Sequence, residues 1–432
     1  MNRRRKVIET GKTALIALLA ASAVLLGWRT RLFNDFFSTV PFFGSVAELM
    51  RGGAGTAETG GASIREAALP VCIVITDDEG GHYGVRYDTE TRNSVYDRTS
   101  SILTESLGSA SEPLEISEDE WRAALSGPGL FFAYATPVKL SVLGGWLLDG
   151  WLSTRMTVFP EDVTLLHLCV AFGDDRSRFY FQDNESGLFY GADTASSTGK
   201  AQELEIYSAN DALFAFETGV GAADNAPYIV LMPAREHPEI RAGGAGSAVE
   251  LFDIALATLG HGDEASTTVQ DEDGVIRRVG TQFSIRADMQ GHVSYRRTDN
   301  LPPVGERQQQ DEGEAIEQAR VIVADTIGET CGSAEVFFES VEYSGGFYSV
   351  YFGYYIAGGR VHLLDDVNAA RVSIFSGVVT EIELNFMSFE FTGEYIVLLP
   401  EKQALAAAGG EFMLCYPDTG TQSLQPVWAL RQ

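Results

Sequence analysis

Basic residues are scarce over most of this 432-residue chain. The sequence contains 31 Lys and Arg against 60 Asp and Glu, for a formal net charge of −29. Seven of the basic residues but only one of the acidic residues fall within residues 1–31, which leaves 24 basic and 59 acidic residues beyond them, a net of −35. So acidic a region repels nucleic acid and anionic lipid headgroups. This excludes a nucleic-acid-binding protein, and we expect the charge mainly to keep the region soluble.

Histidine and cysteine are also few, and neither shows the spacing of a metal site. The six histidines are His82, His167, His237, His261, His292 and His362, and the four cysteines are Cys72, Cys169, Cys331 and Cys415. We therefore predict no metal and no cofactor. Three of the cysteines lie in apolar runs, which favours buried thiols. The pairings Cys72 with Cys169 and Cys331 with Cys415 remain an alternative, because an extracytoplasmic compartment permits disulfides.

Catalytic motifs are missing as well. The sequence contains no GxSxG elbow, no P-loop and no dinucleotide-binding fingerprint. Ser197 and Lys200 match SxxK, but the elements that accompany this motif in its enzymes are absent. An EF-hand centred on Gly274 would place Val269 and Gly280 at its first and twelfth positions, and neither can bind calcium through a side chain. The acidic clusters lie at predicted turns, where Asp is favoured locally. We predict that the protein is not an enzyme.

One long apolar run is present, at residues 13–28 (TALIALLAASAVLLGW), and it carries no charge. As a helix it would rise about 24 Å, less than a hydrocarbon core of roughly 30 Å, so Lys12 and Arg29 would have to snorkel. Five basic residues precede it and two follow, which predicts a cytoplasmic amino terminus and an extracytoplasmic remainder at the cell membrane. A signal peptide cleaved at residues 21–23 is the alternative, disfavoured because that triplet lies inside the run.

The segment around this span supplies candidate contact residues. Ala17 and Ala21 have the small-xxx-small spacing of packed membrane helices, although alanine is also ordinary helix composition. Phenylalanines cluster just beyond the span, which suits a headgroup-level belt or a contact with a partner helix. Residues 52–62 form a Gly-rich linker. Our candidate partner-contact residues are Ala14, Ala17, Leu18, Ala21, Leu25, Phe33, Phe36 and Phe37.

The remaining chain predicts an α+β fold, with antiparallel β-meanders packed against helices. Ser117 begins a predicted helix with Glu120 completing a capping box, and Gly260 ends another at residues 249–259. Further helices are predicted at residues 96–107 and 314–326. Strands are predicted at residues 70–76, 82–87, 130–135, 165–172, 178–182, 187–190, 228–232, 269–296 as hairpins, 334–343, 347–356, 370–375, 378–386, 394–399, 412–417 and 424–430. Residues 241–246 (RAGGAG) are predicted to be a linker.

These signals divide the chain into five parts. They are a cytoplasmic tail and transmembrane anchor at residues 1–31, an aromatic juxtamembrane segment and linker at 32–66, an amino-terminal α+β domain at 67–240, a helix-plus-hairpin unit at 247–300 and a carboxy-terminal α+β domain at 311–432.

Several stretches resemble the YycH/YycI family, the membrane-anchored accessory regulators of the sensor histidine kinase WalK (YycG). They are ALPVCIVITDDEGGHYGVRYD, EDEWRAALSGPGLFFAYATPVKLSVLGGWL, and ATLG with DGVIRRVG and FSIRADMQGHVSYRR. The later VSIFSGVVTEIEL and LQPVWAL resemble the PepSY-related domains of YycI. The resemblance covers most of residues 67–430. It implies a YycH/PepSY-like fold and a non-catalytic regulator that contacts a sensor kinase through its anchor helix and outer domains, as a homo- or hetero-dimer. A PepSY-like envelope module that binds or inhibits a peptidase or a cell-wall hydrolase is the alternative.

Overall fold

A computed structural model of the chain describes residues 67–148, 159, 163–173, 176–195, 204–262, 265–271, 274–299 and 310–431. The predicted membrane span, the aromatic segment, the Gly-rich linker and all eight candidate contact residues therefore lie outside the described residues. Among the helices that the structure does describe, none has both the length and the apolarity needed to cross a bilayer.

The first sheet has seven antiparallel strands in the order β2-β1-β4-β5-β6-β7-β3. Its strands are β1 (Cys72–Thr76), β2 (His82–Val85), β3 (Leu114–Ile116), β4 (Gly129–Lys139), β5 (Thr164–Phe172), β6 (Ser177–Gln182) and β7 (Phe189–Asp193). All five residues of β1 are buried, as a continuous apolar run predicts for an interior strand. Helix α5 (Thr89–Ser109) packs against β1 and β6, α6 (Glu118–Ser126) against β4 and β5, and α7 (Leu140–Leu147) against β4. The predicted hairpin of β1 and β2 is confirmed.

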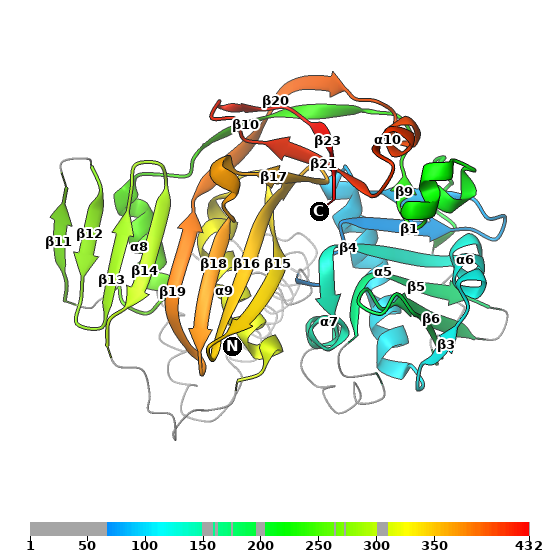
Figure 1. Cartoon of the computed structure of the whole chain (residues 1–432), viewed down its shortest axis with the longest axis horizontal. Coiled ribbons are helices and arrows are strands. Elements are labelled where there is room, and N and C mark those ends of the chain that lie inside the picture. Colours follow the sequence, from blue (N-terminus) through cyan, green and yellow to red (C-terminus); the bar gives the residue numbers. More distant parts are fainter. Residues whose placement is uncertain are drawn as a thin grey trace, which may run out of the picture. The chain divides into compact units, whose positions relative to one another are not determined.

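The second sheet has eleven strands, in the order β11-β12-β13-β14-β19-β18-β16-β17-β21-β23 with β15 beside β16. Its strands are β11 (Thr267–Gln270), β12 (Ile276–Val279), β13 (Phe283–Ala287), β14 (His292–Arg297), β15 (Glu335–Ser344), β16 (Phe347–Ile356), β17 (Gly359–His362), β18 (Ala370–Phe375), β19 (Val378–Asn385), β21 (Phe412–Pro417) and β23 (Val427–Leu430). Helices α8 (Ala248–Thr258) and α9 (Glu312–Val323) lie on one side of this sheet (Figure 1). Side chains of both helices, β14 and β19 line one apolar pocket there.

A third sheet corrects one prediction. Residues 241–246 are not a linker, because β10 (Glu236–Gly244) runs through most of them. This strand pairs with β20 (Met387–Val397) on one side and β22 (Ser423–Leu424) on the other, so the sheet order is β20-β10-β22. The buried strand predicted at residues 228–232 shortens to β9 (Val230–Leu231), which pairs with β8 (Leu213–Phe214). Helix α10 (Glu401–Ala408), which the sequence did not predict, follows β20.

Polar side chains cap the starts of α6, α8 and α9, the first of which the sequence predicted. The Ser117 hydroxyl accepts a hydrogen bond from the backbone N–H of Glu120 at 3.2 Å, which confirms the cap of α6. The predicted capping box is not formed, because the Glu120 carboxylate instead accepts a hydrogen bond from Arg178 of β6 at 2.7 Å. Helices α8 and α9 both begin with a capping box, at Ser247 and Asp311. These caps satisfy backbone N–H groups that have no partner within the helix.

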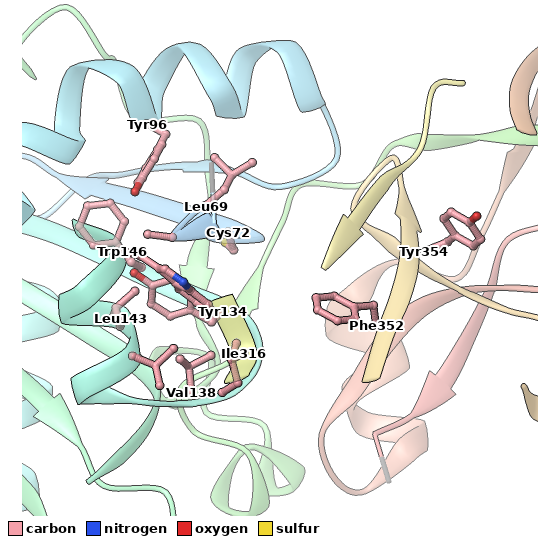
Figure 2. Packing of buried hydrophobic residues seen from close by; sticks show 14 of the residues in the cluster. Leu69, Cys72, Tyr96, Tyr134, Val138, Leu143, Trp146, Ile316, Phe352 and Tyr354 are labelled. Carbon is pink, nitrogen blue, oxygen red and sulfur yellow. The ribbon is translucent and has the colours of Figure 1, made fainter. Parts of the chain in front are cut away.

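The first two sheets share one buried cluster. Figure 2 shows part of it, including Tyr96 of α5, Trp146 of α7, Ile316 of α9 and Phe352 of β16. Polar contacts run beside these apolar ones: Lys139 Nζ lies 2.9 Å from a carboxylate oxygen of Glu312, and Thr136 donates to the Phe338 carbonyl at 3.1 Å. The described residues belong to one compact unit, Gly61–Gln432. The mixed α+β architecture with mostly antiparallel strands confirms the predicted class, whereas the predicted domain limits remain a prediction.

Candidate partner-binding site

The four cysteines are buried and free, so neither of the two considered disulfides is formed. Burial raises the pKa of the Cys169 thiol, and it raises the pKa of Cys331 and of Cys415 to about 11. A thiol with so high a pKa stays protonated at neutral pH and is a poor nucleophile. We conclude that these cysteines act as small apolar core residues.

One side-chain network has the order of a hydrolase triad. The Thr76 hydroxyl lies 2.9 Å from His82 Nδ1, and His82 Nε2 lies 3.1 Å from a carboxylate oxygen of Glu217. Thr76 is buried, however, and its hydroxyl donates to the Leu125 carbonyl at 3.4 Å. The burial of Thr76 keeps its hydroxyl away from solvent, and the network ties β1, β2 and α6 to the segment that follows β8.

Metal ligands do not gather in the part of the chain that the structure describes: no group of three or more His, Cys, Asp or Glu there is placed to share an ion. Asp77, one of the acidic turn residues, accepts hydrogen bonds from the backbone N–H groups of Glu79 and Gly81 at 2.9 and 2.7 Å. That local role agrees with the turn interpretation of the sequence.

Strand β20 and the residues just beyond it carry a run of exposed apolar side chains. Phe391, Tyr395 and Val397 have 49%, 60% and 74% of their surface exposed, and Leu399 just beyond the strand has 46%. Isolated exposed apolar side chains are ordinary, but here four lie along one stretch of nine residues. An apolar run of this kind on an edge strand is typical of an interaction surface.

The pairing of β20 leaves one of its edges available. On its inner side the strand follows β10 from Met387 opposite Gly244 to Val397 opposite Glu236, with a shift of register before Ile240. On its outer side the backbone of Phe389 is bridged by residues 331–333. No described strand pairs with that outer side beyond this bridge. Unpaired backbone groups of an edge strand are a template for a strand from another chain.

A buried polar contact fixes the end of this strand. Glu401, at the start of α10, accepts a hydrogen bond from the Tyr87 hydroxyl at 2.5 Å and another from the Met232 backbone N–H at 2.9 Å. Arg86 lies 3.9 Å from the same carboxylate. Burial raises the pKa of Glu401, and the Arg86 charge and these donors oppose that rise. The contact attaches α10, and hence the chain that leaves β20, to the end of β2.

The sequence did not predict this surface. Its candidates were placed between Ala14 and Phe37, and these positions are outside the described residues. One signal in the sequence points to β20: the alternation of Phe389, Phe391 and Tyr395 with Glu390 and Glu394 is that of a strand. Nothing in the sequence shows which of its sides is left uncovered, because the partner strand β10 is about 150 residues away.

Comparison with known proteins gives one informative result. No protein-family model matches the chain, and no curated protein matches it. The crystal structure of YycH from Bacillus subtilis matches with a TM-score of 0.54 at 12% sequence identity, over 87% of this chain and 96% of that chain. The chain has a YycH-like fold. At this identity the similarity establishes the fold alone. The resemblance to YycI and to PepSY-related domains remains a prediction.

Proposed function

We propose that this protein is a single-pass, membrane-anchored extracytoplasmic regulator that modulates a sensor histidine kinase of the WalK/YycG type without catalysing a reaction. The observation that carries the proposal is the YycH-like fold, which extends over 87% of the chain. Residues 13–28 would hold the protein at the membrane, with the acidic remainder outside.

In this proposal the outer edge of β20 is where the partner docks. An extended segment of the partner would pair with the free backbone groups between Glu390 and Val397, and its side chains would cover Phe391 and Tyr395. The strand is suited to transmit such binding because β10 holds one side of it and Glu401 fixes the chain beyond it. A partner that binds there would therefore contact a strand that is held in place on one side and at its end, and not a loop.

The experiment compares kinase output in cells that lack the gene and in cells that carry the wild-type chain, a Tyr395→Glu/Val397→Glu variant or an Ile206→Glu control. Ile206 is 61% exposed and lies in a turn, so the control introduces the same kind of charge at an exposed apolar position away from β20. Charged side chains on an edge strand oppose strand addition.

The readout is the phosphorylated fraction of the response regulator that the kinase serves. We expect deletion of the gene and the β20 variant to change this fraction in the same direction, and the Ile206 control to match wild type. If deletion of the gene leaves the phosphorylated fraction unchanged, the proposed function is wrong. If deletion of the gene changes the phosphorylated fraction but the β20 variant matches wild type, the docking site is wrong.

A further inference from the structure

The second sheet has an open face that carries arginines. Buried side chains of β13, β14 and β19 face helices α8 and α9, as Ile285 and Tyr295 do. The residues that alternate with them point to the opposite face. On that face Arg277 of β12, Arg286 of β13 and Arg296 of β14 are exposed. In a region with a net charge of −35, this concentration of positive charge is unusual.

Two of these arginines are placed against each other. Arg277 and Arg286 are directly opposite in the β12–β13 register. Side chains at such positions lie about 5 Å apart at their Cβ atoms, and like charges there destabilise the pairing. Within the described residues neither arginine has a carboxylate partner. An anion bound between them would remove the repulsion.

The neighbouring charges on this face are paired. Arg296 Nε lies 3.3 Å from a carboxylate oxygen of Glu381. Arg371 of β18 donates two hydrogen bonds to the two carboxylate oxygens of Glu383, from Nη2 at 2.9 Å and from Nε at 3.2 Å. These two contacts match Arg296 and Arg371 with Glu381 and Glu383, whereas Arg277 and Arg286 remain unmatched, which leaves a local excess of two positive charges beside β12 and β13. A dianion would neutralise this excess.

The arginines surround a hollow of about 320 Å³. Its lining includes Arg277, Arg286, Arg296 and the hydroxyl-bearing residues Ser284 and Ser294. The carboxylates of Glu381 and Glu383 also line it, on the β19 side. The end nearer β12 and β13 therefore has the unpaired positive charge, and hydroxyl donors lie beside it.

We propose that this hollow binds a dianionic phosphate group, either as inorganic phosphate or as a phosphate monoester. Guanidinium groups bind phosphate through paired, charge-assisted hydrogen bonds. A tetrahedral phosphate presents oxygens in several directions, which suits donors from three strands better than a planar carboxylate does. Long polyanions such as nucleic acid are disfavoured because the surrounding net charge of −35 repels them over distances beyond the hollow.

Binding would be measured by isothermal titration calorimetry on the full chain in detergent micelles at pH 8 and constant ionic strength. The probes are inorganic phosphate and phenyl phosphate as dianions, dimethyl phosphate as a monoanionic diester, and acetate as a carboxylate. The variants are Arg277→Gln and Arg286→Gln. Arg98→Gln is the matched control, because Arg98 is exposed on α5 and its replacement makes the same change in net charge.

We expect both dianions to bind saturably and more tightly than dimethyl phosphate or acetate. Loss of either guanidinium should weaken dianion binding about tenfold or more, since charge-assisted hydrogen bonds are lost, while the Arg98 variant stays within twofold of wild type. Phenyl phosphate binding as well as inorganic phosphate would assign the site to monoesters, and phenyl phosphate binding much more weakly would assign it to the free ion. Absence of saturable binding, equal affinity for dimethyl phosphate, or equal weakening by Arg98→Gln would overturn the proposal.

Discussion

The ion pair between Arg92 of α5 and Glu335 of β15 is the sharpest test of how the two large sheets are joined. Arg92 Nη2 lies 2.5 and 2.7 Å from the two carboxylate oxygens of Glu335. The arginine side chain is 1% exposed and the glutamate side chain 23% exposed. Removing Glu335 therefore leaves a fully buried charge, whereas removing Arg92 leaves a charge that water can partly reach.

Replacing Glu335 with Gln leaves a guanidinium that water cannot reach, so we expect a loss of about 4 kcal/mol in the free energy of unfolding. Replacing Arg92 with Met leaves a carboxylate that is about a quarter exposed and that water can partly solvate, so we expect a smaller loss of about 2 kcal/mol. The double variant Arg92→Met/Glu335→Gln contains no unpaired buried charge. It should be more stable than Glu335→Gln alone.

The assay is urea unfolding of the full chain in detergent micelles, followed by tryptophan fluorescence, for wild type, both single variants and the double variant. Together these four proteins form a double-mutant cycle, which isolates the coupling free energy between Arg92 and Glu335. We expect this coupling to be about 2–3 kcal/mol. Equal losses below about 1 kcal/mol for both single variants would show that the pair behaves as an exposed salt bridge, and would refute the reasoning.

Three further outcomes follow from local features. Burial lowers the pKa of His167 and of His237 to about 4. The unfolded chain, in contrast, protonates these histidines near pH 6.5. The free energy of unfolding should therefore be highest above pH 6.5 and fall towards pH 4, by at most about 3 kcal/mol per histidine. Urea midpoints that do not change across this pH range would contradict that expectation. Ser247→Ala should cost about 1 kcal/mol in urea unfolding, since the cap of α8 is lost; no measurable cost would contradict the cap's role. Gly332→Ala should lower the melting temperature more than Gly219→Ala does. Both glycines have a positive φ, but only the Cβ added at Gly332 would lie 2.5 Å from a carbonyl oxygen of β20. Equal changes in melting temperature would show that this contact relaxes.

Local signals predicted much of the fold. Alternation of apolar and polar residues located the hairpins of residues 269–296, and the face of α9 that carries Ile316, Ala319, Ile322 and Val323 is buried as its spacing predicts. Gly260, which has a positive φ, ends α8 as expected. Each of these features depends on residues a few positions apart, which a single sequence displays.

Features that depend on distant pairing were missed. Composition made residues 241–246 resemble a linker, yet β10 pairs there with β20, and its backbone hydrogen bonds rather than its side chains specify the strand. Added Cβ atoms at Gly243 and Gly244 would meet nothing within 4 Å, so these glycines are not required by crowding. The exposed edge of β20 and the opposed arginines on β12 and β13 likewise exist only in the register of the folded chain.

The most direct test of the central claim is cross-linking from the edge of β20 in intact membranes. A photoreactive phenylalanine analogue would replace Tyr395, which is 60% exposed, or Ile206 as the control, in the full chain. After irradiation, the adducts would be purified and the attached protein identified by mass spectrometry. We predict that the Tyr395 position gives an adduct with a membrane sensor histidine kinase and that the Ile206 position does not. No kinase adduct from Tyr395, or the same adduct from both positions, would contradict the account.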